Sequence, residues 1–117
     1  MLARLARLFG RTAAAPVWVE AAELRRWLAG EGAPIIVDVR GADEFDGPLG
    51  HIEGARNIPL ADVAAHATAL AAEGRPLVMV CLTDKRSSQA AAELITAGLD
   101  KVAVLRGGMK AWRATVG

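Results

Sequence analysis

The 117-residue sequence contains only one cysteine and two histidines. A single cysteine excludes an internal disulfide framework and fits a reducing compartment, so we expect a cytoplasmic protein. So few sulfur and imidazole ligands also argue against a structural zinc site, and we expect neither a metal ion nor a cofactor. The apolar runs are far shorter than the ~20 residues that a membrane-spanning helix needs.

Neither sign of charge dominates, because the formal net charge is +1. Without a strongly basic balance there is no case for nucleic-acid binding. The charges are unevenly placed: residues 1–14 contain Arg4, Arg7 and Arg11 and no acidic residue, which gives +3. The remainder contains 11 basic and 13 acidic residues, which gives −2. A basic head therefore precedes a mildly acidic domain.

Residues 1–11 have the periodicity of a short basic amphipathic helix, with Leu2, Leu5 and Phe9 on one face. Residues 12–16 resemble a linker, so we divide the chain into an extension over 1–16 and one domain over 17–117. The extension either packs on the domain or a partner, stays mobile, contacts a membrane surface through residues 1–11, or serves as a targeting segment. A basic amphipathic stretch is compatible with all four.

From Val17 onward, short apolar segments alternate with segments of helical periodicity. The predicted strands cover residues 17–19, 35–39, 55–58, 77–81 and 101–105. The predicted helices cover residues 20–29, 42–45, 60–72, 89–97 and 109–114. Nearly continuous apolar strands that alternate with helices form parallel sheets buried on both sides. The sequence therefore predicts an α/β domain whose sheet carries helices on both faces.

Cys81 closes the apolar run that begins at Leu77, and a polar segment and a helix pattern follow it. It is therefore expected at the carboxyl end of a strand and opposite a helix N-terminus, where ligands bind in open α/β sheets. Free N–H groups at such a terminus stabilise a thiolate and hold an anion. The candidate site consists of Cys81 as nucleophile and Leu82, Thr83, Asp84, Lys85, Arg86 and Ser87 as substrate-binding residues.

Within this segment, the backbone N–H groups of residues 82–86 are expected to form an anion nest around the sulfur. Lys85 and Arg86 supply positive charge, and Ser87 or Ser88 is expected to cap the helix. Asp84 opposes simple activation, because a carboxylate disfavours a nearby thiolate unless it points outward or pairs with Lys85 or Arg86. The alternative is that Cys81 is a small buried apolar residue and that the two cations are merely solvated.

Several further motifs occur in a fixed order along the chain. They are Ile36–Arg40 with Glu44 and Phe45, Gly50–Pro59, Val80 and Cys81 with Arg86 and Ser87, and Val104–Met109 with Ala111 and Trp112. Each motif alone is weak, but their order and separations together are specific. Over about Trp18 to Trp112 the chain resembles the rhodanese-like family.

The resemblance implies a five-stranded parallel sheet with helices on both faces and a six-residue loop that starts at Cys81. It also implies a sulfurtransferase. Cys81 would take sulfane sulfur from thiosulfate or an organic or protein persulfide and pass it, as a Cys81 persulfide, to a thiol or cyanide. Asp38, Arg40 and Glu44 would brace the strand end, and His51 would make a structural hydrogen bond.

Single-domain members of the family often carry glycine where this chain has Asp84. Aspartate tolerates a left-handed turn, so we expect the loop to survive the change, while its charge disfavours small anionic donors. Only four residues separate Cys81 from Arg86, one fewer than in the phosphatase relatives, which disfavours phosphatase activity. The alternative to sulfur transfer is a non-catalytic or regulatory interaction module that presents this loop to a protein partner.

Overall fold

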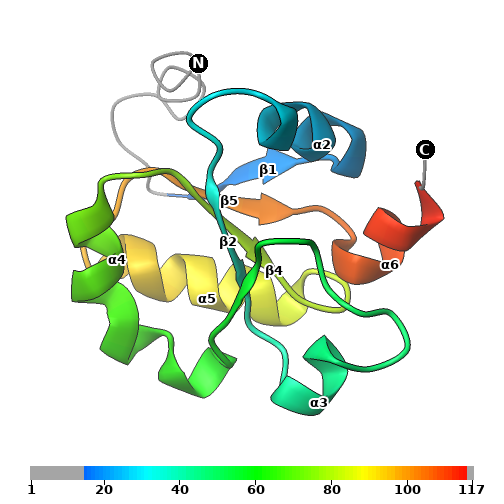
Figure 1. Ribbon diagram of the computed structural model, residues 1–117. Helices are drawn as coiled ribbons and strands as arrows, with labels where there is room; N and C mark the ends of the chain where they lie inside the picture. The colour runs from blue at the N-terminus through cyan, green and yellow to red at the C-terminus, as the bar shows by residue number, and fades with distance from the viewer. Residues whose placement is uncertain (1–14, 116–117) are drawn as a thin grey trace.

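Five parallel strands form one sheet in the computed structural model, which describes residues 15–115 (Figure 1). The strands are β1 (Val17–Val19), β2 (Ile35–Asp38), β3 (Arg56–Asn57), β4 (Leu77–Val80) and β5 (Val102–Leu105). Their order in the sheet is β1-β5-β4-β2-β3, and every pairing is parallel. The predicted five-stranded parallel sheet is confirmed.

Helices cover both faces of the sheet, as predicted (Figure 1). α2 (Ala21–Ala29) and α6 (Gly108–Ala114) lie on one face, and α4 (Ala67–Glu73) and α5 (Lys85–Thr96) lie on the other. The short helix α3 (Ala42–Phe45) follows β2. Strands that are apolar on both sides need this double cover, because a bare face would leave its side chains in water.

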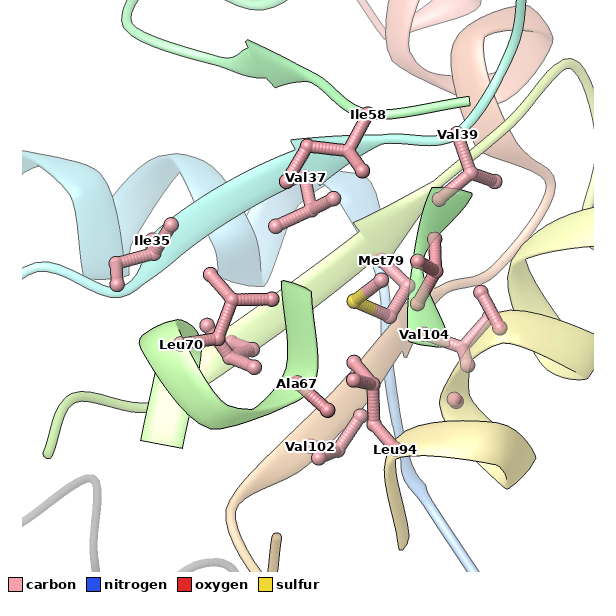
Figure 2. Close-up of a cluster of buried hydrophobic side chains, with 14 of the residues drawn as sticks. Ile35, Val37, Val39, Ile58, Ala67, Leu70, Met79, Leu94, Val102 and Val104 are labelled. Carbon is pink, nitrogen blue, oxygen red and sulfur yellow. The ribbon is translucent and has the colours of Figure 1, made fainter. Parts of the chain in front are cut away.

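The alternation of side chains along each strand divides the core into two apolar clusters. Along β2, Ile35 and Val37 point into one cluster and Ile36 into the other. The first cluster packs against α4 and α5 through Leu70 and Leu94 (Figure 2). The second cluster includes Leu24 and Trp27 of α2 and Met109 and Trp112 of α6. Packing on both sides therefore fixes the central strands and the positions of their carboxyl ends.

The segment after β3 is less regular than the single helix predicted for residues 60–72. Two 3₁₀ turns, Leu60–Asp62 and Ala64–His66, come first, and the α-helix begins only at Ala67. Side chains three positions apart share one face of a 3₁₀ helix. Leu60 and the fully buried Val63 therefore both contact the first cluster. The tighter winding satisfies this packing, which helical periodicity alone does not reveal.

The amphipathic helix predicted for residues 1–11 lies outside the described residues, as does most of the predicted linker over residues 12–16. Between residues 15 and 115, no helix is long and apolar enough to span a membrane.

A buried ion pair closes the carboxyl end of β2. Asp38 and Arg40 are each 1% exposed, and the Arg40 guanidinium donates to the two Asp38 carboxylate oxygens at 2.9 and 2.7 Å. It also donates to the carbonyl oxygens of Glu44 at 3.1 Å and Gly50 at 2.7 Å. Arg40 thus ties β2 to α3 and to the loop beyond it. The bracing role predicted for this pair agrees with these contacts.

Replacing this arginine (Arg40→Met) is expected to lower the free energy of unfolding by about 3–5 kcal/mol, because the Asp38 carboxylate is left buried without its partner. Urea denaturation measures the change. The control is Arg75→Met, since the exposed Arg75 donates to the carbonyl oxygen of Ala33 and its loss should cost under about 1 kcal/mol. Equal losses in the two variants would contradict the role of the buried pair.

Candidate functional site

Cys81 is the first residue after β4, and residues 81–84 connect this strand to α5. Its side chain is only 1% exposed, so the sulfur lies beneath the loop. The Sγ atom accepts a hydrogen bond from the backbone N–H of Ser87 at 3.4 Å, and it lies 3.3 Å from the Ser87 hydroxyl oxygen. Cys81 is therefore where the sequence places it, at a strand end and against a helix N-terminus.

The helix that faces the sulfur begins earlier than predicted. α5 starts at Lys85, not at residue 89. The prediction was wrong because the polar side chains of residues 85–88 are typical of a loop, whereas Ser87 belongs to the buried face of the helix together with Leu94. The earlier start puts the first turn of α5 directly after the Cys81 loop. The first N–H groups of a helix have no partner within it, and here the N–H of Ser87 donates to the sulfur.

The predicted serine cap is also wrong. Ser87 and Ser88 are helical residues, Asp84 occupies the N-cap position, and the Ser88 hydroxyl donates to the Asp84 carbonyl oxygen. The backbone N–H that contacts the sulfur belongs to Ser87, one residue beyond the nest predicted over 82–86. Both differences follow from the start of α5, because a residue inside the first turn points its N–H along the helix axis toward the loop.

Glu44 holds the side chain of Arg86. Two guanidinium nitrogens of Arg86 donate to the two Glu44 carboxylate oxygens at 2.8 and 3.0 Å, and the Gly41 N–H donates to the same carboxylate. The hydrogen bond from Arg86 is the main cause that lowers the pKa of Glu44 from its usual 4.5 to about 2. Glu44 in turn raises the pKa of Arg86. The pair is therefore ionised at neutral pH, and its charges face each other.

The sequence marks Glu44 as a bracing residue but gives no sign of its bond to Arg86. The two residues are 42 positions apart, and only the packing of α3 beside the first turn of α5 brings them together. Glu44 therefore acts on the candidate site itself as well as on the end of β2.

Asp84 is directed to the connection between β5 and α6. Its Oδ2 atom accepts a hydrogen bond from the Gly107 N–H at 3.3 Å, rather than pairing with Lys85 or Arg86. Its φ angle is −151°, which lies outside the left-handed region that favours glycine. The loop therefore accommodates an aspartate here without backbone strain, and the carboxylate links the loop to the turn before α6.

The first turn of α6 packs directly on the loop. The backbone N–H groups of Met109 and Lys110 donate to the carbonyl oxygens of Cys81 at 2.9 Å and Leu82 at 3.1 Å. Gly108 lies at the point of closest approach with φ +56°, and a Cβ atom there would overlap the carbonyl oxygens of Cys81 and Thr83. Only glycine fits this contact, so α6 holds the backbone of the Cys81 loop in place.

The remaining side chains of the loop lie at its rim, where Thr83 and Lys85 are exposed and Leu82 is half-buried. His51 makes a structural contact: its Nδ1 atom lies 2.9 Å from the Phe45 carbonyl oxygen, and the two rings stack. Across residues 15–115, no three His, Cys, Asp or Glu side chains gather in a way that could hold a metal ion. The candidate chemistry therefore centres on the sulfur of Cys81.

The arrangement of sheet, loop and motifs agrees with comparisons against known proteins. The sequence profile described as Rhodanese-like domain matches residues 20–115. The chain belongs to the rhodanese-like family. It is 38% identical over 96 residues to thiosulfate sulfurtransferase GlpE of Pseudomonas putida, and the match covers 82% of this chain and 81% of the relative.

Two further proteins are similar to this chain. Protein YqhL of Bacillus subtilis is 38% identical over 77 residues, which cover 66% of this chain but only 59% of the Bacillus protein. The crystal structure of the Alr3790 protein from Anabaena matches with a TM-score of 0.76 at 34% identity, over 85% of this chain and 88% of the other. The fold and the family resemblance inferred from the motifs are both confirmed.

Replacing the glycine at the loop contact (Gly108→Ala) is expected to lower the free energy of unfolding by about 3 kcal/mol, because steric overlap adds to left-handed strain. Gly74→Ala is the matched control, since Gly74 has φ +65° but no atom within 4 Å of an added Cβ. Strain alone should cost this control about 1–2 kcal/mol. Urea denaturation compares the variants, and equal losses would contradict the close approach of α6.

Proposed function

We propose that the protein is a sulfurtransferase in which Cys81 carries the transferred sulfur as a persulfide. The observation that supports this proposal is the position of Sγ against the Ser87 N–H and hydroxyl, at 3.4 and 3.3 Å. A thiolate or a persulfide anion needs such donors, and the N-terminus of α5 adds partial positive charge. Similarity to GlpE, which is named a thiosulfate sulfurtransferase, supports the same class of reaction.

The proposed reaction has two displacements and needs no external oxidant or reductant. The Cys81 thiolate attacks the sulfane sulfur of a donor, a new S–S bond forms, and the bond within the donor breaks. With thiosulfate, sulfite leaves with the electron pair. A thiolate or cyanide then attacks the outer sulfur of the Cys81 persulfide, and Sγ leaves as a thiolate. The products are a new persulfide or thiocyanate, and the enzyme returns to its starting state.

In this proposal the residues of the loop have different roles. Ser87 stabilises the negative charge on sulfur through its N–H and hydroxyl, and Arg86 fixes Glu44 at the edge of the site. Leu82, Thr83, Asp84 and Lys85 form the rim that a donor and an acceptor contact. Because Cys81 is 1% exposed, a donor has to displace atoms that cover the sulfur before it can react.

The burial of Cys81 also favours a second candidate function, a non-catalytic or regulatory module that presents the exposed Thr83 and Lys85 to a protein partner. In that case the thiol is a packing residue and forms no persulfide. The two functions differ in one measurable property, the ability of Cys81 to accept a sulfur atom.

We also propose the cellular location of the protein, its domain boundaries and its substrates. We place the protein in the cytoplasm, where a lone thiol stays reduced. Residues 17–117 are assigned to one rhodanese-like domain, and residues 1–16 to a basic extension that packs on the domain or a partner, stays mobile, or contacts a membrane surface through residues 1–11. The substrates are a small or protein-borne sulfur donor and a thiol or cyanide acceptor, and we expect neither a cofactor nor nucleic acid to take part.

Intact-protein mass spectrometry tests the first displacement. Reduced protein incubated with thiosulfate or an organic persulfide is expected to gain one sulfur atom, about 32 Da, because Cys81 keeps the outer sulfur. Cyanide or excess thiol should remove the gain, and Cys81→Ser should show none while keeping its far-ultraviolet circular dichroism. A folded wild-type protein that gains no mass with either donor would favour the interaction module.

Removal of the hydroxyl beside the sulfur (Ser87→Ala) is expected to slow persulfide formation about tenfold or more, since a hydrogen bond to a charged group contributes ~1.5–3 kcal/mol. Ser88→Ala is the matched control, because the Ser88 hydroxyl bonds the Asp84 carbonyl oxygen instead. Stopped reactions analysed by mass give both rates. If the two variants slow the reaction equally, the Ser87 hydroxyl has no special role at the sulfur.

A further inference from the structure

Three arginines at the carboxyl edge of the sheet form ion pairs with carboxylates. Each follows or faces the end of a strand, where an anionic substrate would approach a thiol at the end of β4. The pairs are Arg40 with Asp38, Arg86 with Glu44, and Arg106 with Glu20, at 2.7, 2.8 and 2.7 Å. Each of these three guanidinium groups is therefore already paired with a carboxylate and is not free to bind an anion.

Arg86 is the arginine that a donor bound at Cys81 would need. It lies in the first turn of α5, as does Ser87, whose N–H donates to the Cys81 sulfur. A guanidinium binds an oxyanion best through two parallel N–H bonds. Both of these bonds go to Glu44, which the Gly41 N–H holds in turn. An anion would have to displace a fixed carboxylate to engage Arg86.

Asp84 adds a negative charge at the rim of the same site. The hydrogen bond from the Gly107 N–H fixes its carboxylate, so the charge remains in the loop that covers Cys81. The neighbouring Lys85 is exposed and offsets this one charge. Within the loop itself, the charges of Asp84 and Lys85 therefore cancel.

We propose that Glu44 and Asp84 determine which donors the site accepts: they disfavour dianionic thiosulfate and select sulfane sulfur carried on a thiol, R–S–SH. This inference rests on the proposed sulfur transfer at Cys81. The protonated persulfide carries no charge on the transferred sulfur and needs no guanidinium. The Cys81 thiolate attacks its outer sulfur, the donor S–S bond breaks, and the thiolate R–S⁻ leaves and takes up a proton. The class of reaction that supplies the protein is therefore one that forms persulfides on thiols.

The test compares two donors that share a sulfane bond and differ by one charge, the dianion thiosulfate and the monoanion methanethiosulfonate. Rate constants for the gain of sulfur by Cys81 are measured by mass spectrometry for the wild type, Glu44→Gln and Asp84→Asn. Each variant is expected to raise the ratio of the thiosulfate rate to the methanethiosulfonate rate about fivefold, since one charge–charge repulsion is removed. Asp100→Asn is the control, because it removes the same charge before β5, at the opposite edge of the sheet.

The outcomes separate this inference from the proposed function. A ratio that Glu44→Gln and Asp84→Asn leave unchanged, or that Asp100→Asn raises equally, overturns the selectivity while sulfur transfer stands. If Glu44→Gln does not fold, Asp84→Asn decides alone, because asparagine keeps an acceptor for the Gly107 N–H. Failure of the wild type to gain sulfur from either probe or from 2-mercaptoethanol persulfide overturns the proposed function and this inference together.

Discussion

The buried ion pair between Asp38 and Arg40 is the constraint on which the functional edge of the sheet depends. Its arginine reaches from the end of β2 to the carbonyl oxygens of Glu44 and Gly50, and so fixes α3. The position of α3 sets the carboxylate of Glu44, which holds Arg86 in the first turn of α5. A charge pair taken out of water is stable only when its remaining donors are satisfied, and here satisfying them fixes α3 and the segment that leads to Gly50.

The backbone around the sulfur is held mainly by backbone groups. The Cys81 carbonyl oxygen accepts the Met109 N–H, and the sulfur accepts the N–H of Ser87. Gly108 allows these segments to touch. Among the rim side chains, Asp84 adds a hydrogen bond to this frame through the Gly107 N–H, while Thr83 and Lys85 are exposed. Backbone contacts therefore set the shape of the loop, and the side chains at its rim set its charge.

The sequence predicted the strands, the two helical layers and the place of Cys81 because hydrophobic periodicity reports them directly. It was less accurate where polar residues have structural roles. Ser87 belongs to the buried face of α5, but a serine beside charged residues has the pattern of a loop, so α5 was predicted too short. The 3₁₀ turns before α4 were missed for a related reason: spacings of three and four residues both satisfy a helical pattern, and only packing chooses between them.

By itself the sequence determined the α/β architecture, the family and the position of the single cysteine at a strand end, since these follow from local pattern and from the order of motifs. Only the tertiary structure decided which charged side chains are paired and which are free to bind an anion. Arg86 has the sequence position of an anion-binding residue, yet Glu44, 42 positions away, engages it, and Asp84 bonds to Gly107 rather than to its charged neighbours. Ion pairing depends on distances of a few ångströms between segments remote in the chain, and no local pattern encodes those distances.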